Sequence, residues 1–115
     1  MIDTIPDLVW LKDPEGVYLS CNRRFESLFG AAEKDIVGKT DYDFTGADLA
    51  DSFRQHDEAA IAAGVTTANE EAIVFAEDGH REILETIKTP VLASDCRLIG
   101  VLGVGRDITG RKQAE

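Results

Sequence analysis

Cysteines are scarce in this sequence and long apolar runs are absent, and each shortage excludes a class of protein. Only Cys21 and Cys96 occur in 115 residues, with no C-x-x-C pair and no histidine nearby at metal-ligand spacing. We interpret both as free thiols of a cytoplasmic domain. The sequence alone does not exclude a disulfide between them, and it does not identify their roles.

Charges interrupt every apolar stretch, and the first residues, MIDTIPDLVWLKD, lack the basic start and apolar core of a secretory signal. We therefore expect no membrane segment.

Basic residues are also in short supply. Lysine and arginine number 12 against 22 aspartates and glutamates, which gives a net charge of −10. Such a surface repels phosphate backbones, so nucleic acid is not an expected partner. A chain of 115 residues suits one domain with a single core.

Strand-forming segments lie at both ends of the sequence. The segment DPEG (Asp13 to Gly16) has the composition of a turn, and Asp78-Gly79 is a strong hairpin signal. Pro90 is expected to end the strand that runs from Arg81 to Thr89. The sequence predicts strands over residues 8–13, 17–21, 70–76, 81–89 and 98–107.

The middle of the chain has helical spacing. Asn22 is placed to cap a helix over residues 23–30, and a single turn is expected to end near Gly38. The longest predicted helix spans residues 45–64, with a capping box between Thr45 and Asp48. This order predicts an α+β domain in which helices cross one face of an antiparallel sheet.

The last predicted strand, LIGVLGVGRD, is apolar on both faces. An antiparallel strand with one face in water normally alternates apolar with polar residues. We therefore expect this strand to be central in the sheet, with the helices covering one face. A second subunit or flanking helices would cover the other, which predicts a homodimer.

From end to end the chain resembles a PAS domain with its C-terminal PAC segment. The resemblance depends on the order of WLKDPEGVYLSCN, RRFESLFG, DIVGKTDYDF, FRQHDEAAIAAG, EDGHREILETIKTPV and LIGVLGVGRDITGRKQAE. The most specific piece is Asp107-Ile108-Thr109 after the glycine-rich last strand. The resemblance implies a five-stranded antiparallel sheet in the order 2-1-5-4-3, with the helices on one face.

The resemblance also implies a sensory role without catalysis by the domain itself. Residues 1–109 would form the sensor, and residues 110–115 would begin a linker helix leading to a C-terminal effector in a longer chain. Asp107, Ile108 and Thr109 would transfer the signal. We expect the module of a two-component sensor histidine kinase, responding to a ligand, a redox state or dimer geometry. The alternatives are a ligand-free dimerisation module and the PAS domain of a diguanylate cyclase or phosphodiesterase.

A small ligand, if one binds, is expected between the sheet and the helices. Glycines 100, 103 and 105 leave two explanations open, a widened pocket or close packing of a helix on the sheet. The pocket residues would be drawn from apolar core positions and one histidine: Trp10, Phe25, Phe29, Phe53, His56, Ile61, Ile73, Phe75, Ile83, Val101 and Gly103.

The sequence identifies no cofactor, catalytic residue or metal site. Haem-binding relatives place an axial histidine on the helix that holds His56, but here it is displaced by about one helical turn. We therefore disfavour haem and expect His56 to be hydrogen-bonded near Asp57 or a backbone carbonyl. A photoactive flavin adduct is also disfavoured, because the segment KTDYDFTG lacks the cysteine that such light sensors carry.

Overall fold

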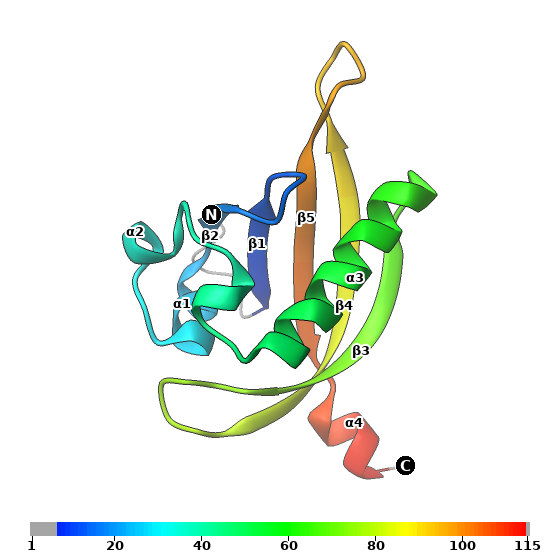
Figure 1. Ribbon diagram of the computed structural model, residues 1–115. Coiled ribbons are helices and arrows are strands. Elements are labelled where there is room, and N and C mark those ends of the chain that lie inside the picture. Colours follow the sequence, from blue (N-terminus) through cyan, green and yellow to red (C-terminus); the bar gives the residue numbers. More distant parts are fainter. Residues whose placement is uncertain (1–6, 115) are drawn as a thin grey trace.

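The computed structural model describes residues 7–114 and contains strands at both ends of the chain with helices between them (Figure 1). None of the helices in residues 7–114 is long and apolar enough to cross a bilayer. In chain order, the elements are β1 (Leu8–Lys12), β2 (Tyr18–Cys21), α1 (Arg23–Phe29), α2 (Glu33–Ile36), the 3₁₀ turn η2 (Asp41–Asp43), α3 (Ala47–Ala63), β3 (Thr67–Val74), β4 (Arg81–Leu92), β5 (Leu98–Asp107) and α4 (Thr109–Ala114).

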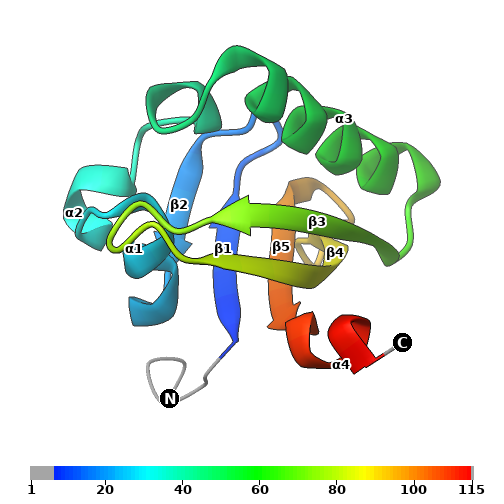
Figure 2. The same cartoon turned by 90° about the horizontal axis from the view of Figure 1, so that it is seen from below.

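The strands form a single antiparallel sheet in the order β2-β1-β5-β4-β3. This confirms both the strand order implied by the family resemblance and the central position of the last strand. α1, α2 and α3 lie on one face of the sheet, and α4 leaves from the end of β5 (Figure 2). The sheet therefore has an inner face under the helices and an outer face that no described helix covers.

Two local predictions were wrong. β4 continues past Pro90 to Leu92, because beyond Lys88 it pairs only with β5 and has become an edge on its other side. Edges are where sheets tolerate a residue without an N–H group. The capping box joins Thr40 and Asp43 instead of Thr45 and Asp48, while α3 starts after Gly46 with no side-chain cap.

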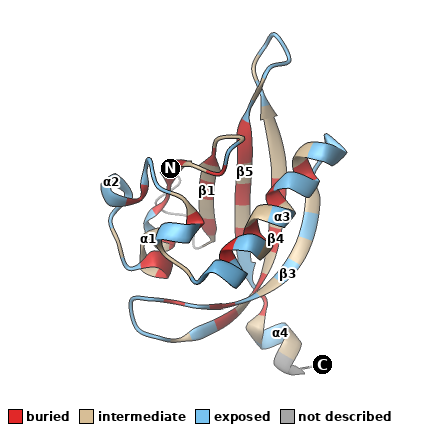
Figure 3. Cartoon of the chain, in the orientation of Figure 1, coloured by how far each residue is buried: buried red, intermediate tan, exposed pale blue. Residues whose placement is uncertain are grey.

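Burial alternates along the strands and separates the two faces (Figure 3). The outer face carries a row of half-buried aliphatic side chains, in which Val9, Val104 and Ile87 are paired neighbours across β1, β5 and β4. The inner face and helices enclose a core of Leu8, Trp10, Tyr18, Cys21, Phe25, Leu28, Phe29, Ile36, Phe53, Ile73, Phe75 and Leu84.

The glycines of β5 allow close packing. A Cβ atom at Gly103 would lie 2.1 Å from Cε2 of Trp10, and one at Gly100 would lie 1.9 Å from the carbonyl oxygen of Lys12. The indole ring of Trp10 therefore occupies the space that a side chain at Gly103 would need. The nearest atoms at both positions belong to β1 and the residue after it, so these glycines allow close packing between neighbouring strands, which is neither the widened pocket nor the helix packing that the sequence left open.

We expect Gly103→Val to lower the free energy of unfolding by about 1–3 kcal/mol, the usual cost of overpacking a core, because the new side chain would displace Trp10. Gly110→Val is the matched control, since a Cβ there meets nothing within 4 Å. Its effect should stay within about 0.5 kcal/mol. Urea unfolding measures both changes, and equal destabilisation by the two variants would contradict the packing explanation.

Candidate functional site

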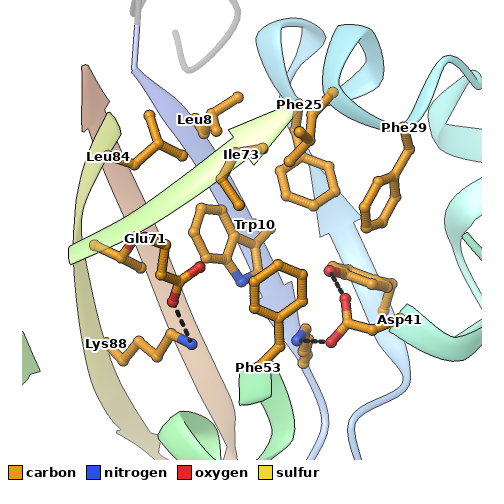
Figure 4. A pocket seen from close by; sticks show the side chains of 14 residues that line it. Leu8, Trp10, Phe25, Phe29, Asp41, Phe53, Glu71, Ile73, Leu84 and Lys88 are labelled. Carbon is orange, nitrogen blue, oxygen red and sulfur yellow. Dashed lines mark hydrogen bonds and ion pairs between the residues drawn. The ribbon is translucent and has the colours of Figure 1, made fainter. Parts of the chain in front are cut away.

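A small cavity of about 20 Å³ lies between the sheet and the helices (Figure 4). This is space for roughly one water molecule, so a larger ligand needs displacement of the surrounding side chains. Its lining is apolar on one side and charged or hydroxylated on the other: Leu8, Trp10, Lys12, Tyr18, Phe25, Leu28, Phe29, Asp41, Phe53, Glu71, Ile73, Leu84, Thr86 and Lys88.

The structure brings part of the predicted pocket to this cavity. Trp10, Phe25, Phe29, Phe53 and Ile73 line it. Their roles in binding a ligand stay predictions, because aromatic and aliphatic side chains at these places also build the core. The cavity wall therefore combines core residues with polar groups that the sequence analysis did not select.

Other predicted pocket residues lie away from the cavity lining. Ile83 is on the outer face of β4, since its neighbours Glu82 and Leu84 are the buried inner residues. Phe75 is fully buried but stacks on His80, with ring centroids 4.3 Å apart. These two placements correct the predicted pocket.

The remaining members are buried or half-buried without lining the cavity. Val101 and Gly103 are buried in β5, opposite Lys12 and Trp10 of β1. Ile61 is a half-buried residue of α3, and it does not contribute to the lining. The helix therefore contributes Phe53 to the lining and places Ile61 elsewhere.

His56 also lies outside the cavity lining. Its Nδ1 atom is 3.7 Å from Oε1 of Glu71 but has no hydrogen-bond partner among the described residues. The hydrogen bond predicted for His56, near Asp57 or to a backbone carbonyl, is therefore not made by Nδ1. No described group of three or more histidine, cysteine, aspartate and glutamate side chains is arranged to hold a metal ion.

Buried charges form the polar side of the site. Lys12 Nζ lies 2.5 Å from Oδ2 of Asp41 and 2.8 Å from Oδ2 of Asp57. Lys88 Nζ lies 3.2 Å from Oδ1 of Asp57 and 3.6 Å from Oε1 of Glu71. Three carboxylates therefore surround two ammonium groups in the interior. We call Lys12, Asp41, Asp57, Glu71 and Lys88 the interior ion network.

Strand alternation contained a signal for the two lysines of this network. Lys12 follows Leu8 and Trp10 at every second position, and Lys88 follows Leu84 in the same way. Both ammonium groups should therefore point inward with the apolar residues. Their partners come from η2, α3 and β3, so only the folded chain identifies them.

Tyr18 extends the network to β2. Its hydroxyl donates a hydrogen bond of 2.5 Å to Oδ1 of Asp41. Burial of the phenol raises the pKa of Tyr18 well above its usual value, and the negative charge and hydrogen bond of Asp41 raise it further. The phenol therefore stays a neutral donor throughout the physiological pH range.

One buried polar atom of the cavity wall, Oγ1 of Thr86, has no hydrogen-bond partner among the described residues, whereas Oδ1 of Asp57 meets Lys88 as an ion pair without the geometry of a hydrogen bond. Thr86 is 1% exposed and lines the cavity. A buried hydroxyl without a partner is costly, so a water molecule or a ligand atom at this wall would gain a hydrogen bond. The site can therefore bind a polar group.

The residues predicted for signal transfer, Asp107, Ile108 and Thr109, are held by several hydrogen bonds at the end of β5. We call these three residues the junction. Both the backbone N–H and the hydroxyl of Thr109 donate to Oδ1 of Asp107, at 2.9 and 2.5 Å. Ile83 holds the junction from β4: its N–H donates to Oγ1 of Thr109, and its carbonyl accepts from the N–H of Ile108. The hydrogen bond from the Thr109 hydroxyl is the main cause of a lowered pKa at Asp107.

The junction leads directly into α4. Ile108 is buried, whereas α4 extends past the end of the sheet, with Lys112 Nζ 3.1 Å from Oε1 of Glu70 (Figure 1). The hydrogen bonds of Ile83 therefore fix the point at which the helix leaves the domain.

Comparison with known proteins gives a family match over nearly the whole chain. A family model described as "PAS fold" matches residues 2–113. The aerobic respiration control sensor protein ArcB of Escherichia coli is 30% identical over 112 residues, which cover 97% of this chain and 14% of ArcB. The methanogenesis regulatory histidine kinase FilI of Methanothrix harundinacea is 27% identical over 114 residues, 99% of this chain and 13% of FilI. The chain thus spans about one seventh of these relatives.

A shorter relative and two solved structures are also similar to this chain. A diguanylate cyclase of Vibrio cholerae is 29% identical over 102 residues, which cover 88% of this chain and 32% of the cyclase. The structure described as "VqmA bound to DPO" superposes with a TM-score of 0.85 at 26% identity, covering 95% of this chain and 55% of that one. Another solved structure is described as a VqmA dimer from Vibrio cholerae. It superposes with a TM-score of 0.85 at 26% identity, covering 95% of this chain and 50% of that one.

The two tyrosines of the chain test the interior ion network. Tyr18→Phe removes the donor to the buried Asp41 and should cost about 1.5–3 kcal/mol, the range for hydrogen bonds to charged groups. Tyr42→Phe is the control, because the hydroxyl of Tyr42 bonds Asp51 at the surface and should matter by less than about 0.5 kcal/mol. Chemical denaturation compares the two, and similar losses would show that Asp41 does not depend on Tyr18.

Tyr18 should also be visible in a pH titration. Because its pKa is raised, the folded state retains the phenolic proton that the unfolded chain releases near pH 10, so stability should fall as pH rises above about 10. Ultraviolet absorbance of Tyr42→Phe follows Tyr18 alone. Ionisation should coincide with unfolding, and a reversible ionisation of the folded protein near pH 10 would contradict this environment.

Proposed function

Because the chain belongs to the PAS fold family, we propose that it is the sensory module of a cytoplasmic signalling protein, specifically of a two-component sensor histidine kinase. Two relatives support this assignment, one named as a sensor protein and one as a histidine kinase. The domain itself would perform no catalysis and would act on a C-terminal effector. The match to a diguanylate cyclase supports the alternative effector.

One observation carries the sensory proposal: β4 lines the cavity and also holds the start of α4 by hydrogen bonds. Leu84, Thr86 and Lys88 point from β4 into the cavity, while Ile83 holds Ile108 and Thr109 at the start of α4. A ligand that displaces the inner side chains of β4 would therefore change the strand that fixes α4. No other described strand combines a cavity wall with hydrogen bonds to this junction.

The site is proposed to bind a small molecule with an apolar body and at least one polar group. The body would contact Trp10 and Phe53, and the polar group would reach Thr86 and Lys88. DPO, the molecule named with VqmA, is a suitable first probe because the part of VqmA that superposes on this chain, 55% of VqmA, is 26% identical to it.

Binding is tested directly on the purified chain. Small molecules extracted from natively purified protein are identified by mass spectrometry, and DPO is titrated while the unfolding temperature is recorded. A ligand at a hundredfold excess over its Kd should add about 2.7 kcal/mol to stability. If no molecule co-purifies and no probe raises the unfolding temperature, the ligand-free dimerisation module replaces the sensor as the better assignment.

Transmission is tested with Thr109→Val, which removes the hydroxyl between Asp107 and Ile83. The Kd of the bound molecule should stay unchanged, while its effect on the amide signals of α4 in NMR spectra should disappear. Thr66→Val is the control, because among residues 7–114 the hydroxyl of Thr66 bonds Thr89, at an exposed place away from α4. If the signals of α4 respond equally to ligand in both variants, the junction does not transmit.

The outer face of the sheet supports a homodimer as part of the same proposal. Its aliphatic row across Val9, Val104 and Ile87 is only half-buried in one chain, and the related VqmA is described as a dimer. We expect Val104→Glu to shift the protein from dimer to monomer in analytical ultracentrifugation. Leu92→Glu, at an exposed position near the tip of the β4-β5 hairpin, should leave the dimer intact. Equal masses of the two variants would exclude this interface.

The parent assignment depends on the rest of the gene. A histidine kinase requires, after residue 115, a dimerisation helix with a phosphorylatable histidine and a nucleotide-binding domain. A cyclase domain in that place would select the alternative effector and leave the sensory role of this chain unaffected.

A further inference from the structure

A second charged cluster lies at the turn between β3 and β4. Each ring nitrogen of His80 faces a carboxylate: Nδ1 is 2.5 Å from Oδ1 of Asp78, and Nε2 is 2.5 Å from Oε2 of Glu82. Asp78 is exposed, whereas the side chain of Glu82 is only 8% exposed. The imidazole therefore joins a solvent-exposed carboxylate to a buried one.

This arrangement needs a protonated histidine. A neutral imidazole has one N–H donor and one acceptor nitrogen, whereas the imidazolium has two donors. With both carboxylates ionised, only the imidazolium can donate to Asp78 and Glu82 together. Loss of the proton removes one of the two hydrogen bonds and removes the positive charge from both carboxylates.

The charged groups around His80 favour the proton. Asp78 comes from the turn and Glu82 from β4, and Asp107 lies at the end of β5, where the charge of His80 contributes to its lowered pKa. Arg24 of α1 is the opposing cation and pairs with Glu82. Two carboxylates thus contact the ring, while Asp107 and Arg24 are the further charged groups of this region. Hydrogen bonds to Glu82 and then Asp78 raise the pKa of His80 above its ordinary value.

Packing connects the ring to the helices. His80 stacks on Phe75 with an interplanar angle of 16°, and the guanidinium carbon of Arg24 lies 4.5 Å from the centroid of the Phe75 ring. The backbone N–H of Phe75 donates to the carbonyl of His80, and that of Ala76 donates to the carbonyl of Leu28 in α1. The turn is therefore attached to α1 as well as to β4.

The cluster around His80 is adjacent, in sequence and in space, to the residue that holds the start of α4. Glu82 directly precedes Ile83, whose N–H and carbonyl hold Thr109 and Ile108. The position of Glu82, held by His80 and Arg24, therefore affects the backbone that anchors α4.

We propose that His80 is a proton-binding site that controls the attachment of α4. In the protonated state the imidazolium holds the turn to the start of β4 and keeps the junction at Ile83 closed. Release of the proton weakens the hold on Glu82 and loosens the junction. The proposal rests on the proposed function only for the signalling role of α4, and it is independent of any ligand in the interior cavity.

The direction of the pH dependence follows from linkage. A histidine with a raised pKa in the closed state stabilises that state fully below its ordinary pKa of about 6.5, and this contribution is lost as pH rises through the raised value. The junction should therefore be tight in mildly acidic solution and looser in alkaline solution.

The experiment is an NMR pH titration of the ligand-free chain. The ring signals of its two histidines report their pKa values, and the amide signals of Ile83, Ile108 and Thr109 report the junction. We expect the three amides to titrate with the midpoint of His80, above about 6.5. The hydrogen-exchange protection factor of Ile108, corrected for intrinsic exchange, should fall about tenfold for each pH unit by which that midpoint exceeds 6.5.

Three variants make the result specific. His80→Gln, which carries no charge at any pH, should abolish the pH dependence of the junction, while His56→Gln should retain it. Asp78→Asn changes only an exposed turn residue and should move the midpoints of His80 and the junction together to lower pH. The proposal is overturned if the junction titrates unchanged without His80, if it stays static while His80 titrates, or if His80 titrates at or below its ordinary pKa. Each of these results would leave the ligand tests unaffected.

Discussion

Lys12 and Lys88 hold the sheet and α3 together through the carboxylate of Asp57. Their ammonium groups extend from β1 and β4, strands that lie on either side of β5, and both reach the same side chain of the helix. Asp41 and Glu71 bring η2 and β3 to the same centre. Removal of one partner from a buried ion pair costs about 3–5 kcal/mol, because the other charge remains buried. The helix can therefore sit on the sheet in few positions.

The interior ion network also determines the character of the cavity. A wall of leucine and phenylalanine alone would give an apolar pocket, but Lys12 Nζ lies 5.0 Å from the ring centroid of Tyr18 and Lys88 Nζ lies 6.0 Å from that of Phe53. Burial in this low-dielectric setting strengthens each polar interaction and penalises each unpaired atom. Small changes in the contents of the cavity can therefore have large energetic effects on β4.

β4 is the strand on which the proposed inputs meet. Its inner residues face the interior ion network, its first residues contact the cluster around His80, and Ile83 between them holds the start of α4. Both proposed inputs therefore act on one hydrogen-bonded junction. Two backbone groups of Ile83 hold the residues at the start of α4, so a shift of Ile83 from either side of the domain acts on that helix.

Much of the fold was determined by the sequence itself. Turn residues and strand alternation predicted most elements, and the apolar character of both faces of residues 98–107 correctly placed that strand at the centre of the sheet. These signals are local, since they depend on φ angles, caps and periodicity within a few residues.

The inward direction of Lys12 and Lys88 was available from the same periodicity. Their partners were not: Lys12 meets Asp41 and Asp57 across 29 and 45 residues of chain. The pairing of His80 with Glu82 is local, since the two residues are only two positions apart. The placement of Ile83 at the start of α4, the pairing of Arg24 with Glu82 and the small size of the cavity, like the partners of the two lysines, were decided by tertiary structure, because these groups from separate elements meet only in the folded chain.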